Sequence, residues 1–147
     1  MDTAILQTKL IQNNHKYRYT FEAAEAGLIQ AEQALFNNAI TPCLLTKPIK
    51  NLSQQPIAWW QHQCRASFPE SKVYYVIEKL AFNHCIHFTK KENRRVYFYR
   101  ISSFAIAKTG GAAIILQTTF TRFSSEICFI PTKRKLSLGR LSWYQLK

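Results

Sequence analysis

The sequence is poor in the residues that interrupt regular structure, with only four glycines and five prolines among its 147 residues. That scarcity argues against a fold made mainly of loops. The sequence contains no run of eighteen apolar residues that would span a membrane as a helix, and no secretory signal is visible. With 47% hydrophobic and 14% aromatic residues, the composition is that of one folded domain with a sizeable core.

The motifs of common catalytic sites are also missing. The sequence has no Gly-rich phosphate loop, no His-Glu-x-x-His and no Gly-x-Ser-x-Gly. Acidic residues beyond the first 38 positions are few and far apart, namely Glu70, Glu78, Glu92 and Glu126. Nothing in this spacing suggests the paired carboxylates of a hydrolytic site. We therefore expect no catalytic residues, no cofactor and no enzymatic activity.

Basic residues outnumber acidic ones. The sequence has 20 lysines and arginines and 8 acids, which gives a net charge of +12. The basic residues gather in clusters, which are Lys90-Lys91 with Arg94-Arg95, then Lys133-Arg134-Lys135, then Arg140. Such clusters fit either solvated loops of a basic protein or a patch for an anionic partner such as nucleic acid, lipid headgroups or an acidic protein. We favour solvated loops, because no nucleic-acid-binding motif accompanies the charge, and DNA stays an alternative partner.

The four cysteines, Cys43, Cys64, Cys85 and Cys128, form no Cys-x-x-Cys pair, which argues against zinc and thioredoxin-type sites. An even number fits two disulfides in an oxidising compartment. Three pairings are open, and the sequence alone does not choose among them. Economy of connection favours Cys43 with Cys64, and a returning last strand would pair Cys85 with Cys128. The run His84-Cys85-Ile86-His87 is weak evidence for a metal, and a cystine beside two histidines is the better interpretation.

The first 38 residues contain no proline and one glycine, and they predict a single long helix over residues 2–38. Its apolar stripe consists of Leu10, Tyr17, Phe21, Ala24, Leu28, Ala31 and Leu35. At ~1.5 Å per residue the helix would be ~55 Å long, about twice the width of a small domain.

Only part of such a helix can pack on its own domain. We expect Phe21, Ala24, Leu28 and Leu35 to be buried. We expect Ile5, Leu6, Leu10 and Ile11, with Tyr17, to form a subunit interface, because few neighbours are available to cover them. The helical pattern is already present at Met1-Asp2, which suggests a fragment whose helix began earlier.

After a connection over residues 39–71, the apolar period changes from helical to alternating. Strands are predicted at 72–78, 96–103 and 112–122, with a polar hairpin loop at 83–95 and short strands at 126–131 and 141–144. A turn is expected at Lys108-Thr109-Gly110-Gly111. In the adjacent pair Trp59-Trp60, one ring is expected to be buried and the other partly exposed. The predicted fold is α+β, one domain over 1–147 with the helix on one face of an antiparallel sheet at 72–147.

These segments resemble the PilX-type minor pilins of type IV pili. The similarity rests on Phe21-Glu22-Ala23-Ala24-Glu25-Ala26-Gly27-Leu28 with Ala31-Glu32, on Tyr99-Arg100-Ile101-Ser102-Ser103, and on Gly110-Gly111-Ala112 leading to Leu116-Gln117-Thr118-Thr119. The order matches over roughly residues 17–122. The resemblance implies a pilin-like fold, in which a long N-terminal helix packs its second half on an antiparallel sheet. The family's peptidase cleavage site and apolar half-helix are absent here, as expected of a fragment that starts within the helix.

The resemblance also implies a role. Family members are not enzymes, but subunits that prime pilus assembly at the periplasmic face of the inner membrane and later lie at or near the pilus tip. Their partners are other minor pilins, the major pilin and, in many systems, a large tip adhesin. The alternative is a DNA- or surface-binding pilin-like module that uses its basic face.

Overall fold

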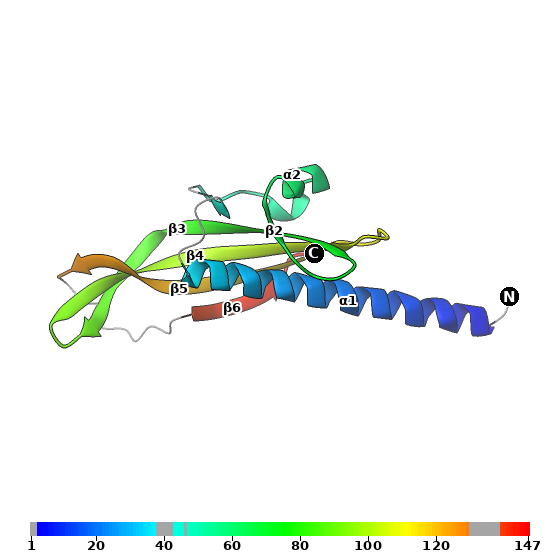
Figure 1. The fold of residues 1–147 in the computed structure, drawn as a ribbon, viewed down its shortest axis with the longest axis horizontal. Coiled ribbons are helices and arrows are strands. Elements are labelled where there is room, and N and C mark those ends of the chain that lie inside the picture. Colours follow the sequence, from blue (N-terminus) through cyan, green and yellow to red (C-terminus); the bar gives the residue numbers. More distant parts are fainter. Residues whose placement is uncertain (1–2, 38–42, 46, 130–138) are drawn as a thin grey trace.

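The computed structural model describes residues 3–37, 43–45, 47–129 and 139–147, and gives only the backbone of residues 3–6, 8–11 and 13. Helix α1 (Thr3–Phe36) lies along one face of a long sheet (Figure 1). Its N-terminal part extends past one end of the sheet, and the strands extend past its C-terminal end. Among the described helices, none is both long and apolar enough to cross a membrane.

The second half of α1 forms the first core with the sheet. Ala23, Ala24, Leu28, Ala31 and Leu35 are fully buried against it. This confirms the predicted burial of Ala24, Leu28 and Leu35, whereas Phe21 is only partly buried at the edge of the core. The periodic spacing of these small and aliphatic residues places them on one face of the helix.

Within the described residues the sheet has six strands and is mostly antiparallel. The strand order is β1 (Leu44–Leu45), β3 (Ser71–Thr89), β4 (Glu92–Ala107), β5 (Ile114–Cys128) and β6 (Gly139–Gln145), and β2 (Cys64–Ala66) also pairs with β3. The long strands confirm the antiparallel sheet predicted at 72–147, except that β1 runs parallel to β3 and that both short strands, β1 and β2, lie within the connection. Strands of two or three residues are too short to show a period of two.

The face of the sheet opposite α1 carries a second, smaller core. It contains Tyr74, Val76, Phe104 and Ile115, and the connection covers it with η2 (Leu52–Gln54) and α2 (Ile57–Gln61). Trp60 is fully buried here, and its ring stacks on that of Phe104 with centroids 5.2 Å apart, while Trp59 is partly exposed. The connection therefore acts as a covering layer, which explains why β3 buries side chains on both faces.

The prediction of a long hairpin loop at residues 83–95 is wrong, because most of these residues belong to strands. β3 continues to Thr89 and β4 begins at Glu92, so that only Lys90 and Lys91 form the turn. This part of the sheet lies beyond the end of α1 (Figure 1), where no helix selects apolar residues at every second position. Residues 83–96 and 123–128, in the part of β3, β4 and β5 that extends beyond α1, are called the arm below.

Candidate functional site

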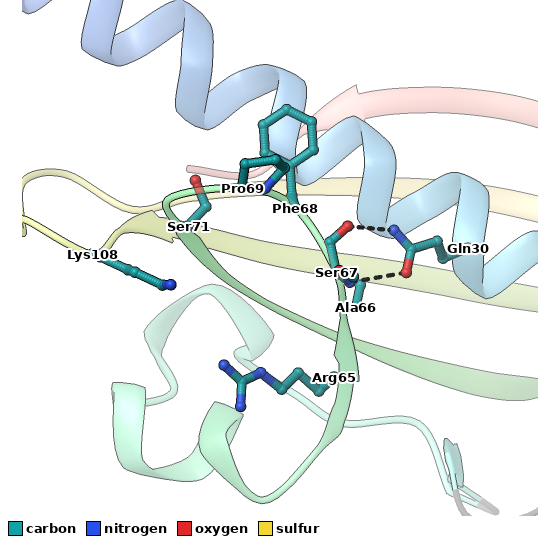
Figure 2. Close-up of a pocket in the computed structure, with 8 residues that line it drawn as sticks. All are labelled: Gln30, Arg65, Ala66, Ser67, Phe68, Pro69, Ser71 and Lys108. Carbon is teal, nitrogen blue, oxygen red and sulfur yellow. Dashed lines mark hydrogen bonds between the residues drawn. The ribbon is translucent and has the colours of Figure 1, made fainter.

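The packed half of α1 is held from both sides by polar contacts. On one side the Gln30 amide donates to the carbonyl of Ser67 at 2.7 Å and accepts from its backbone N–H at 2.9 Å (Figure 2). On the other side Arg140 of β6 forms ion pairs with Glu25 at 2.9 Å and Glu32 at 2.6 Å. Trp143 donates its indole N–H to the same Glu25 at 3.0 Å. These contacts fix the direction in which the rest of the helix extends.

The extending part of α1 begins near Tyr17. This residue is 51% exposed, and its hydroxyl donates to Gln145 Oε1 at 3.2 Å. The described side chains that precede it, including those of Gln12, Asn14 and His15, are exposed. Of the predicted interface, the side chains of Ile5, Leu6, Leu10 and Ile11 lie outside the described residues. Their backbone belongs to the N-terminal part of α1.

The structure joins Cys43 to Cys64 and Cys85 to Cys128, the pairing predicted from the sequence. The second disulfide links β3 to β5 although β4 lies between them, with a Cα–Cα distance of 5.9 Å. In a flat sheet two strands with one between them are ~9.5 Å apart, because neighbours are ~4.8 Å apart. The arm is therefore rolled, and the register shifts in β3 and β4 supply the required bending.

Four of the seven residues in the predicted basic patch are described, and all four lie on the arm. Lys90 and Lys91 are exposed at the turn of the arm. Arg94 lies 3.4 Å from Glu92, and Arg95 lies 3.6 Å from Glu126. The three basic positions Lys133, Arg134 and Lys135 lie outside the described residues.

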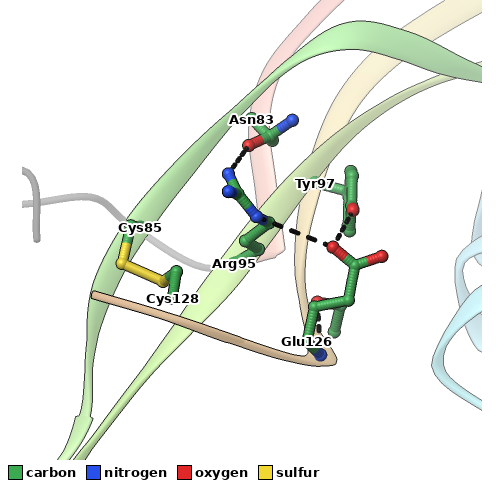
Figure 3. The surroundings of a disulfide bond; sticks show 7 residues. Asn83, Cys85, Arg95, Tyr97, Glu126 and Cys128 are labelled. Atoms are coloured by element: carbon green, nitrogen blue, oxygen red, sulfur yellow. Dashed lines mark hydrogen bonds and ion pairs between the residues drawn. A yellow bond between two sulfur atoms is a disulfide. The ribbon is translucent and has the colours of Figure 1, made fainter. Parts of the chain in front are cut away.

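Arg95 also belongs to a small polar network beside the second disulfide. It donates to Asn83 Oδ1 at 2.7 Å, and Tyr97 donates to Glu126 at 2.5 Å (Figure 3). Carboxylates thus offset two of the four arginine and lysine residues predicted at the arm, and the exposed positive charge concentrates at Lys90 and Lys91.

A buried ion pair escaped the sequence analysis. Glu78 is fully buried, and both of its carboxylate oxygens accept from Arg100, at 3.0 and 2.7 Å. The same carboxylate accepts the backbone N–H of Ile49 at 2.8 Å, which ties the covering layer to the sheet. The hydrogen bonds to Glu78 raise the pKa of Arg100 further above its usual value. The only sequence signal was an acid within an otherwise apolar strand.

A cavity of about 590 Å³ lies between α1 and the loop that joins β2 to β3 (Figure 2). Its described lining includes Arg65, Lys108 and Ser71 but no histidine, cysteine or acid. Among the described residues, no three histidines, cysteines or acids are grouped as metal ligands.

The arrangement thus offers two surfaces for contact with other molecules, one at each end of the molecule. The first is the part of α1 that precedes Tyr17, and the second is the turn of the arm with Lys90 and Lys91. Neither surface contains, among its described residues, a group of side chains that performs acid–base or nucleophilic chemistry in an evident way. Comparison of the chain with protein-family models, with curated proteins and with solved structures finds no match in any of the three.

Proposed function

We propose that this chain is a structural subunit of a type IV pilus, a minor pilin, and not an enzyme. The observation that carries the proposal is the mismatch between α1 and the sheet. At 34 residues the helix is ~51 Å long, and Tyr17 is the first of its described side chains that hydrogen-bonds to a strand. A helix that leaves its own domain in this way needs another binding surface for its apolar residues.

A helical filament provides that surface. The sequence places Ile5, Leu6, Leu10 and Ile11 on the extending part of α1. In a filament core these residues would pack on the corresponding helices of neighbouring subunits, where burial of apolar area supplies about 25 cal/mol per Å². The resemblance of residues 17–122 to PilX-type minor pilins supports the same assignment and adds a pilin-like fold.

The proposal also includes partners and location. The subunit would meet other minor pilins and the major pilin at the inner membrane, and would then lie near the pilus tip, where a large adhesin can join it. Lys90 and Lys91 would favour acidic partners and speed their encounter more than they strengthen the complex.

The test replaces apolar residues of the extending helix in cells that make the full-length protein. Leu6→Ser with Leu10→Ser should abolish surface pili, counted by electron microscopy, because the filament contact is lost. The matched control is Ile57→Ser on α2, which removes an exposed apolar side chain from the covering layer. Immunoblots check that the cells contain equal amounts of the parent protein and of each variant. Normal piliation of the double variant at normal amount would refute the proposal.

DNA binding is the second candidate function, favoured by the exposed Lys90 and Lys91 at the turn of the arm. Affinity for duplex DNA would be measured over a range of salt concentrations. If both lysines contact phosphates, Lys90→Gln with Lys91→Gln should reduce the slope of log affinity against log salt by about 2. An unchanged slope would exclude these lysines from phosphate contact, and binding that vanishes at moderate salt would indicate general charge attraction only.

A further inference from the structure

A cavity of about 420 Å³ lies at the base of the arm, and one of its lining residues, Arg122, also contacts the last turn of α1. Three cationic residues, Lys79, Arg94 and Arg122, contribute to its lining, together with Ser124 and Ser125. They come from β3, β4 and β5, and meet there because the arm is rolled. No pattern in the sequence indicated this grouping, since the three cations lie far apart along the chain.

Two of the cations are held in place by other groups. Lys79 Nζ lies 3.8 Å from the centroid of the Tyr97 ring, within the range of a cation–π contact. Arg122 Nη1 donates to the carbonyl of Leu35 in the last turn of α1. A positive charge at the C-terminus of a helix is favourable, because the carbonyl groups there carry partial negative charge. These contacts reduce the conformational freedom that the cations would lose when they bind a ligand.

One hydrogen-bond donor of Arg94 lacks an acceptor among the described residues. Its guanidinium carbon lies 4.0 Å from the centroid of the Phe88 ring, and Nη2 lies 3.4 Å from Glu92. Its Nε is buried and has no hydrogen-bond partner among the described residues. A buried donor without an acceptor is unfavourable, and proteins usually satisfy such groups with protein atoms, water or a ligand.

One carboxylate also lines the cavity, that of Glu126, but it is engaged by other groups. It accepts from the Tyr97 hydroxyl at 2.5 Å and lies 3.6 Å from Arg95 (Figure 3). Arg95 therefore offsets much of its charge. The balance of charge that a ligand would meet stays positive.

We propose that this cavity binds a small oxyanion, that is, a carboxylate, sulfate or phosphate group, between Lys79, Arg94 and Arg122. The oxyanion supplies the acceptor that Arg94 lacks, and the hydroxyls of Ser124 and Ser125 donate to its remaining oxygens. Charge-assisted hydrogen bonds from a planar guanidinium suit all three groups. The inference does not depend on the filament proposal, because it uses only residues of this cavity.

The test uses the purified protein with its disulfides intact. It is titrated with inorganic sulfate, inorganic phosphate or glucuronate, and isothermal titration calorimetry measures the binding. Sodium chloride keeps the ionic strength equal throughout. We expect saturable binding of at least one of the three, and the order of their affinities identifies the source of the oxyanion. If none of them binds in a saturable manner, the proposal is overturned.

Two single variants distinguish specific binding in the cavity from non-specific electrostatic attraction. Arg94→Gln should weaken binding at least ~10-fold, which corresponds to ~1.4 kcal/mol for a lost charge-assisted hydrogen bond. Lys90→Gln removes the same charge from the nearby turn, outside the cavity lining, and should change the affinity less than ~2-fold. An equal loss in both variants would overturn the proposal in favour of non-specific attraction.

A second variant covers the case in which Arg94→Gln does not fold, as judged by its melting curve. Ser124→Ala with Ser125→Ala leaves every charge in place and removes two donors from the cavity. It should weaken binding several-fold at an unchanged melting temperature. Unchanged affinity in this double variant would place the bound oxyanion elsewhere and would overturn the site as described.

Discussion

At the scale of single residues, two positions decide how the layers fit together. Gly27 is the one glycine of α1, and it faces the sheet where a Cβ atom would overlap Ser103 Oγ and lie 2.7 Å from Val73 Cγ1. Glu78 pairs with Arg100 within the sheet, and it accepts the backbone N–H of Ile49 from the covering layer. In both cases a residue type that is unusual in its element marks a close contact between elements.

Gly27→Ala should therefore destabilise the protein although alanine favours helices. The helix preference of alanine is worth ~1 kcal/mol, whereas overpacking of a well-packed core costs ~1–3 kcal/mol. We expect a net loss of up to ~2 kcal/mol in the free energy of unfolding, measured by denaturant titration. Ala26→Gly is a comparison that changes the helix preference beside Gly27 without adding an atom. A more stable Gly27→Ala variant would show that α1 can move away from the sheet without cost.

Buried tyrosines predict a loss of stability at alkaline pH. Burial raises the pKa of Tyr75 and of Tyr99 above the ordinary value of 10.0. Between pH 10 and the raised pKa, the folded state binds more protons than the unfolded state. The contribution of these two tyrosines to the free energy of unfolding is therefore fully present below about pH 10, and it is lost as the pH rises through the raised pKa.

Denaturant titrations at about pH 9 and about pH 11, on either side of the ordinary tyrosine pKa, check this expectation. Tyr99→Phe removes one of the two ionisable groups, so that the loss between these pH values should be smaller in the variant. The same loss in the variant as in the parent protein would mean that other groups cause the alkaline instability.

At the scale of elements, α1 changes character along its length. Its second half buries Leu28 completely, whereas the adjacent Ile29 is 44% exposed. Its N-terminal part extends past the sheet (Figure 1). The arm at the other end is a rolled three-stranded sheet that a disulfide closes. Each element thus contains one part that builds the domain and one part that extends away from it.

Leu28→Ala should reduce the free energy of unfolding by ~2–5 kcal/mol, because it leaves a cavity between α1 and the sheet. Ile29→Ala removes an aliphatic side chain from the next position of the same helix, and we expect a change below ~1 kcal/mol because that side chain is partly solvated. Urea titrations of the two variants measure the difference. Similar losses in both would contradict the assignment of the buried face.

At the scale of the whole molecule, one compact region lies between two extended ends. Residues of both cores lie in the region where α1, the sheet and the covering layer overlap. The part of α1 before Tyr17 and the turn of the arm lie outside that region (Figure 1). Local opening is expected to be easiest where few buried apolar contacts hold the backbone.

Hydrogen exchange of the isolated chain tests this arrangement. Backbone amides of residues 20–35 should be protected nearly as well as those of the central strands, because opening them disrupts the core. Amides of residues 7–14 should exchange much faster, at rates close to those of an isolated helix. Equal protection along α1 would show that its first half is covered in solution, for example by a second copy of the chain.

Local patterns in the sequence were enough to identify the main elements and their buried faces. The stripe at Ala24, Leu28 and Leu35 showed which face of α1 is buried, and the alternation at Val73, Tyr75 and Ile77 showed the face of β3 that receives it. Local periodicity reports these features because neighbours in one element share one environment. Connection economy also pointed to the disulfide pairing that the structure contains.

The remaining features depend on contacts between elements and became visible only in the folded chain. The arm lacks an apolar period because α1 ends before it, so its strands resembled a polar loop in the sequence. The pairing of Glu78 with Arg100, the close contact at Gly27 and the group of Lys79, Arg94 and Arg122 each join residues from different elements. Such contacts depend on the register and rolling of the strands, which long-range pairing sets and which no local pattern of residues encodes.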